Sequence, residues 1–143
     1  MYAEVINGVV IRPLRNGETE VVQSVFDRLG PRSRLQRFGG AKNVLTQSDL
    51  AQLARVDGRH HVLVASVDQQ PVGIARLVRN GRTAEIAVEV VDDMQGRGVG
   101  TVLMRRLAAD ATAAGVERLE ASVAPENLAS RRLLRGYAVL KAA

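Results

Sequence analysis

The 143-residue sequence contains no cysteine and no tryptophan, and only two phenylalanines and two tyrosines. Without cysteine the chain has no disulfide, no thiolate metal site and no cysteine nucleophile. Hydrophobic residues still make up 46% of the sequence, so it can bury a core, and that core must be mainly aliphatic. The length is typical of one domain, and we expect residues 1–143 to form a single domain.

Long apolar runs are also missing, since no stretch approaches the ~18 apolar residues of a membrane span. The start, Met1-Tyr2-Ala3-Glu4, lacks the basic residues and apolar core of a signal peptide. The sequence therefore predicts a cytoplasmic protein without a membrane partner.

Acidic residues number 15 against 20 basic ones, which gives a net charge of +5 and favours anionic partners. The basic residues are mostly arginines spread along the chain, with neither a lysine run nor interleaved aromatics for base stacking. We therefore expect no direct nucleic-acid binding. We also expect no metal site, because the two histidines, His60 and His61, are adjacent and point oppositely along an extended segment.

The most informative stretch is residues 92–101, Asp-Asp-Met-Gln-Gly-Arg-Gly-Val-Gly-Thr. Before it, residues 83–91 alternate with the period of a strand, and after it residues 99–114 space apolar side chains for one helix face. The three glycines between these segments allow close backbone approach. The first N–H groups of the helix have no intrahelical partner, so the stretch predicts a site for a phosphate-bearing ligand.

Two other phosphate-binding motifs fit this stretch less well. A Walker A loop ends in Gly-Lys-Ser/Thr, and no lysine is present here. A dinucleotide fingerprint fits Gly96, Gly98 and Gly100 loosely, with Thr101 in the last position and acidic residues about 20 positions later. That interpretation leaves too few residues for the repeated units of a dinucleotide-binding fold, because about two-thirds of the chain precedes the motif.

The pattern Gln95-x-x-Gly98-x-Gly100 resembles the acyl-CoA pyrophosphate loop of the GCN5-related N-acetyltransferase (GNAT) superfamily, and Pro125-Glu126-Asn127 follows at the family's spacing. The resemblance covers residues 9–136. It implies an α/β (α+β) single-domain fold with a mixed, mostly antiparallel sheet flanked by helices. The usual C-terminal strands are shortened here, and an exposed sheet edge invites pairing, so we expect a homodimer.

Periodicity and turn signals place the elements in that family's order, β-α-α-β-β-β-α-β-α. The basic segment 32–40 is expected to be a mobile loop or short helix, either a solvated surface or a wall of the acceptor pocket. Asn80-Gly81 predicts a hairpin turn. Strands are expected at residues 9–14, 62–67, 72–78, 83–91 and 116–123, and helices at residues 18–29, 46–54, 99–114 and 127–134.

Acetyl-CoA is the cofactor that the resemblance implies, with its pantetheine arm between parallel strands at 83–91 and 116–123 that splay apart. The implied cofactor-binding groups lie at the first strand's end, in the loop and at the start of the last helix. They are Val90, Val91, Gln95, Gly96, Arg97, Gly98, Val99, Gly100, Thr101 and Asn127.

The implied reaction transfers an acetyl group to a primary amine, which must lose a proton to a general base. Glu85 and Glu89 share one side of their strand. The sequence of residues 84–88, Ala-Glu-Ile-Ala-Val, resembles that of bacterial protein lysine acetyltransferases, whose catalytic glutamate occupies the Glu85 position. Glu85 is therefore the first candidate for the general base, and Glu89 is the second. The family's tyrosine acid falls at Leu134 here, which leaves Tyr137 as the candidate acid.

The sequence therefore predicts an acetyl-CoA-dependent N-acetyltransferase that acts on a protein lysine or a small-molecule amine. The missing tyrosine and the shortened C-terminal part leave an alternative, a non-catalytic or degenerate acyl-CoA-binding module.

Overall fold

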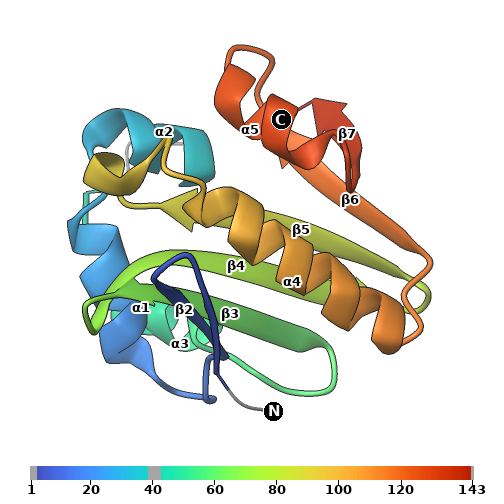
Figure 1. The fold of residues 1–143 in the computed structure, drawn as a ribbon, viewed down its shortest axis with the longest axis horizontal. Coiled ribbons are helices and arrows are strands. Elements are labelled where there is room, and N and C mark those ends of the chain that lie inside the picture. The colour runs from blue at the N-terminus through green and yellow to red at the C-terminus, as the bar shows by residue number, and fades with distance from the viewer. Residues whose placement is uncertain (1–2, 39–42, 143) are drawn as a thin grey trace.

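The computed structural model describes residues 3–38 and 43–142, which form a seven-stranded sheet with helices on both faces (Figure 1). The strands lie in the sheet in chain order, antiparallel up to β5 and parallel from β5 to β7. The strands are β1 (Glu4–Ile6), β2 (Val9–Pro13), β3 (His60–Val67), β4 (Gln70–Asn80), β5 (Thr83–Val90), β6 (Arg118–Val123) and β7 (Val139–Ala142). The helices are α1 (Thr19–Asp27), α2 (Pro31–Phe38), α3 (Gln47–Leu53), the short 3-10 helix η1 (Asp92–Met94), α4 (Val99–Ala113) and α5 (Leu128–Leu134).

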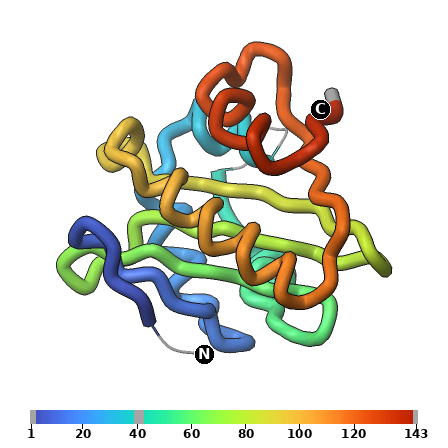
Figure 2. Tube along the Cα trace, turned by 45° about the vertical axis from the view of Figure 1, so that its right-hand side comes forward, coloured from blue at the N-terminus to red at the C-terminus, as the bar shows by residue number. Residues whose placement is uncertain are grey.

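Helix α4 covers one face of the sheet, and α1, α2 and α3 lie on the other face (Figures 1 and 2). The apolar face predicted for α4 is confirmed, because Val99, Leu103 and Leu107 are at most 1% exposed. They pack in one aliphatic core with the centres of β3 and β4. The predicted mixed, mostly antiparallel sheet flanked by helices is therefore confirmed.

The N-terminal hairpin of β1 and β2 was not predicted. Asn7 and Gly8 connect its strands, with φ of 53° and 79°, the left-handed conformation that a two-residue hairpin turn requires. The hairpin predicted at the second Asn-Gly pair is confirmed. Asn80 pairs with Thr83, so its two-residue turn consists of Gly81 and Arg82.

The basic segment after α1 is a helix. Pro31, which could have marked only the end of the preceding helix, is the first residue of α2, a position where its missing N–H costs nothing. Residues 39 and 40 lie outside the described residues. The predicted start of the next helix is confirmed, because Thr46 and Asp49 form a reciprocal capping box.

Strand β7 was not predicted. It pairs in parallel with β6, with Val139 opposite Glu120, and it is four residues long, so this short strand forms the C-terminal edge of the sheet. The oligomeric state stays a prediction. In the described part of the chain, no helix is long and apolar enough to cross a membrane.

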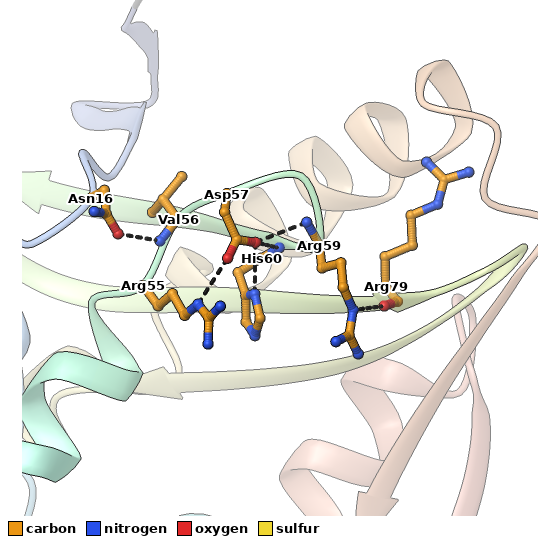
Figure 3. A network of polar contacts seen from close by, with 7 residues as sticks. All are labelled: Asn16, Arg55, Val56, Asp57, Arg59, His60 and Arg79. Atoms are coloured by element: carbon orange, nitrogen blue, oxygen red, sulfur yellow. Dashed lines mark hydrogen bonds and ion pairs between the residues drawn. The ribbon is translucent and has the colours of Figure 1, made fainter.

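Asp57 organises the turn between α3 and β3 (Figure 3). Its carboxylate accepts the backbone N–H groups of Arg59 and His60 at 2.8 and 2.9 Å. The His60 Nδ1 and Arg55 Nε atoms each lie 2.8 Å from it. The hydrogen bond to the His60 side chain, followed by that to the Arg59 backbone, holds the pKa of Asp57 far below its ordinary value.

The two histidines point in opposite directions, as expected, since the His61 Nε2 atom lies 2.8 Å from Asp110 of α4. Within residues 3–38 and 43–142, no three histidine or acidic side chains gather into a possible metal site.

Replacing Asp57 is expected to lower stability in a pH-dependent way. The folded-state pKa is depressed, so the carboxylate's contribution is complete above the ordinary value of 3.8 and is lost as the pH falls from there toward the folded-state pKa. Asp57→Asn should therefore reduce the free energy of unfolding in urea most at neutral pH. The exposed Glu126→Gln variant is the control. An Asp57→Asn effect that is equally large below pH 3.8 would contradict this assignment.

Candidate functional site

The site begins where β5 and β6 separate. The two strands pair only from Thr83 to Glu85, and the rest of β5 pairs with β4 alone. The Val91 N–H donates to β4 at 2.9 Å. Because the direction of backbone groups alternates along an antiparallel ladder, those of Val88 and Val90 face the open side. A cavity of about 560 Å³ is lined by both residues and by β6.

The glycine-rich loop forms one end of this cavity. Gly96 and Gly98 have φ of 75° and 84°, which side chains rarely tolerate, and Gly98 is the N-cap of α4. The Val102 N–H donates to the Gly98 carbonyl at 3.1 Å, so the preceding N–H groups of the first turn have no intrahelical acceptor. The predicted loop residues that line the cavity are Gln95, Gly96, Gly98, Val99, Gly100 and Thr101.

The other predicted cofactor residues differ in their positions. Val90 and Asn127 line the cavity, and the Asn127 side chain also caps α5 by accepting the Ser130 N–H at 3.3 Å. Val91 is fully buried with its N–H bonded to β4, and Arg97 does not line the cavity. The structure therefore gives no support to a backbone contact from the Val91 N–H or to an Arg97 contact inside the cavity.

Gln95 fixes the loop to the end of β5. Its Nε2 group donates to the Val90 carbonyl at 2.9 Å and to the Ser33 hydroxyl of α2 at 3.2 Å. The first of these bonds satisfies a carbonyl that the missing β6 partner leaves free. Gln95 therefore positions the loop through its side chain as well as lining it.

The acidic pair before the loop ties it to the start of α2. Asp92 accepts the Ser33 hydroxyl at 2.7 Å and the Gly30 N–H at 3.1 Å, and Asp93 forms an ion pair with Arg28 at 3.0 Å. A Cβ atom at Gly30 would collide with the Asp92 carboxylate. Helix α2 contributes to the cavity wall, so the loop and that wall are held as one unit.

Glu85 lines the cavity and its side chain is 48% exposed. The Ser122 hydroxyl of β6 donates to it at 3.1 Å, and the Lys141 Nζ atom of β7 donates to it at 3.2 Å. Lys141 also donates to Glu120 at 3.3 Å. The strand pairing explains the cluster, because Glu85 lies opposite Glu120, and Ser122 opposite Lys141, so all four side chains share one face.

Glu89 also lines the cavity, but it is 8% exposed and surrounded by positive charge. Its Oε2 atom lies 2.7 Å from the Arg37 Nε of α2, although not in hydrogen-bonding alignment, and its Oε1 accepts from Arg76 at 3.5 Å. Burial lowers the pKa of Arg76, and the charge of Glu89 opposes that effect. Glu89 therefore joins α2 to the sheet.

The predicted acid, Tyr137, does not line the cavity; it packs against the core after α5. Leu134, at the family's tyrosine position, does line the cavity and has no proton to donate. The structure thus gives no support to the assignment of Tyr137.

Sequence reasoning missed Lys141, Ser122, Asp92 and Arg37. Asp92 stood within the motif and Arg37 within the basic segment, but neither position reveals its partner. Lys141 pairs with a residue 56 positions earlier, a contact that no local pattern encodes.

Comparison with known proteins gives the family. The profile described as Acetyltransferase (GNAT) family matches residues 31–137. The curated Acetyltransferase Pat of Mycolicibacterium smegmatis is 32% identical over 130 residues, which cover 87% of this chain and 39% of that protein. Acetyltransferase PA5475 of Pseudomonas aeruginosa is 34% identical over 133 residues, covering 87% and 71%.

Solved structures agree with this result. The GNAT domain of PAT from S. lividans has a TM-score of 0.84 at 25% identity, covering 90% of this chain and 80% of that one. The putative acetyltransferase yncA from Salmonella typhimurium, solved with its cofactor acetyl-CoA, has a TM-score of 0.70 at 25% identity, covering 91% and 78%. The chain belongs to the GNAT family of acetyltransferases, and it spans well under half of the M. smegmatis relative.

The two candidate bases are expected to differ in their effect on stability. Glu89→Gln leaves two guanidinium groups near a neutral amide, and breaking a buried ion pair costs about 3–5 kcal/mol. Glu85→Gln removes an exposed pair worth about 0–1 kcal/mol. Denaturant unfolding of both variants measures the difference. Equal losses of stability would show that Glu89 is not the structural member of the pair.

Proposed function

We propose that the chain is an acetyl-CoA-dependent N-acetyltransferase that acetylates a primary amine, on a protein lysine or a small molecule. The observation that carries the proposal is the continuous cavity from the glycine-rich loop, along the open side of β5, to the Glu85 carboxylate. Residues 1–143 would form the single catalytic domain.

The cavity fits acetyl-CoA, which supplies an activated thioester. The free N–H groups at the start of α4 suit a pyrophosphate, because the helix dipole also favours negative charge there. The backbone of Val88 faces the open side of β5 and suits the amide groups of a pantetheine arm. The Val90 N–H faces the same way, whereas its carbonyl is already bonded to Gln95.

Glu85 is proposed as the general base. Its carboxylate lies at the cavity and is half exposed, so an acceptor ammonium can pair with it before losing a proton. The Ser122 hydroxyl orients the carboxylate by donating a hydrogen bond to its Oε1 atom. Glu89 is the weaker candidate, because its carboxylate is buried between two arginines.

The acceptor class remains part of the proposal. The sequence of residues 84–88, which resembles that of bacterial protein lysine acetyltransferases, favours a protein lysine. A second candidate, a non-catalytic acyl-CoA-binding module, is favoured by one observation. Leu134 occupies the cavity position where the family's tyrosine acid is expected.

A kinetic comparison tests this assignment. With a panel of lysine peptides and small amines, Glu85→Gln should lower kcat about 10²- to 10⁴-fold, because positioned general bases contribute that much. Affinity for acetyl-CoA should not change.

The matched control is Glu120→Gln, which removes the neighbouring carboxylate on β6 and should retain turnover. Unchanged turnover in Glu85→Gln would remove the assignment of Glu85. Binding of acetyl-CoA by the wild-type protein without turnover of any amine would support the module.

A further inference from the structure

The Glu85 carboxylate already has a primary amine beside it. The Lys141 Nζ atom lies 3.2 Å from Glu85 Oε2 and 3.3 Å from Glu120 Oε1, and the Lys141 side chain is 45% exposed. Glu85 in turn lines the cavity that is proposed to hold the thioester. Lys141 does not itself line the cavity, but its amine lies within hydrogen-bonding distance of Glu85, the group proposed to take a proton from the acceptor amine.

The composition makes this placement informative. Of the 20 lysine and arginine residues in the sequence, only Lys42 and Lys141 are lysines. Every other basic side chain that forms a described ion pair with a carboxylate is an arginine or a histidine. An arginine at position 141 would serve an ion pair equally well, since it is always charged. A primary amine, unlike a guanidinium, becomes a nucleophile once it is deprotonated.

We propose, resting on the function proposed above, that Lys141 is an acetyl acceptor of this chain's own active site. The carbon–sulfur bond of the acetyl thioester breaks and a carbon–nitrogen bond to Lys141 Nζ forms. One ammonium proton passes to Glu85 before attack, the second leaves from the adduct, and the sulfur departs as a thiolate that takes up one proton. The products are N-acetyl-Lys141 and free coenzyme A.

Attachment of Lys141 to the same chain favours this reaction in cis. Its amine is held at a high effective concentration beside Glu85 without a binding step. Glu85 and Glu120 raise the pKa of the Lys141 ammonium, which keeps most of the amine protonated. Modification should therefore be slow compared with turnover of a good acceptor.

Acetylation changes the site, because the amide carries no charge and no longer links Glu85 to Glu120. The Glu85 carboxylate is then open to an external amine. The modification would thus convert an occupied acceptor position into a free one.

The test incubates the full chain with acetyl-CoA and no other amine, followed by intact-mass and peptide-mapping analysis. One acetyl group is expected on Lys141, with a first-order rate constant that stays unchanged over a ~100-fold range of protein concentration. Lys42 reports the non-enzymatic background in the same map. Equal modification of both lysines, or a rate constant that rises with protein concentration, would overturn the proposal.

Variants separate catalysis from simple charge pairing. Glu85→Gln should slow modification of Lys141 at least ~100-fold, whereas Glu120→Gln, which removes the other carboxylate from the same ammonium, should retain it. Equal rates in these two variants would mean that Glu85 does not catalyse the step. In a mixture of Lys141→Arg and Glu85→Gln proteins, acetylation of the latter would show transfer between molecules and would overturn the proposal in cis.

External amines distinguish the two proposals. Turnover of a lysine peptide by the wild-type protein without acetylation of Lys141 would overturn this inference alone. A protein that binds no acetyl-CoA and acetylates neither Lys141 nor any amine would overturn the proposed function as well.

Discussion

The central constraint on this structure is the separation of β5 from β6 after Glu85. Unpaired backbone groups within a protein must find other partners. Gln95 provides one for the Val90 carbonyl, and the remaining open side of β5 faces the cavity. Glu85 is the last residue of β5 that pairs with β6, so the proposed base lies at the closed end of the gap.

Ion pairs and hydrogen bonds with α1 and α2, on the face of the sheet opposite α4, support this gap. Asp92 and Asp93 hold the start of α2 and the end of α1 against the loop, and Glu89 holds Arg37 against β5. These contacts join the proposed cofactor loop, the cavity wall and the central strands. A change in any of them is expected to affect both ends of the cavity.

The sequence predicted the central part of the fold because its patterns are local. Alternation in residues 83–91, the loop glycines and the apolar face of α4 each depend on near neighbours along the chain. The prediction missed β1 and β7, which are three and four residues long. Such short strands have too few alternating positions to be recognised in the sequence, and they form because neighbouring strands pair with them.

The candidate site divides in the same way. The loop residues were predicted from one continuous motif, and Glu85 from the resemblance of residues 84–88 to lysine acetyltransferases; most of the loop does line the cavity. The different environments of Glu85 and Glu89 were not predictable, because both lie on one side of one strand. Glu89 is buried and paired with Arg37 and Arg76, whereas Glu85 meets Lys141 of β7, and all three partners lie on other elements.

Calorimetric titration of the purified protein with acetyl-CoA, and with NAD and ATP at the same concentrations, tests the central claim most directly. If the open side of β5 and the start of α4 form an acyl-CoA site, acetyl-CoA should bind with a saturable one-to-one isotherm while NAD and ATP should not bind. Binding of NAD in place of acetyl-CoA, or of none of the three, would contradict the assignment of the cavity.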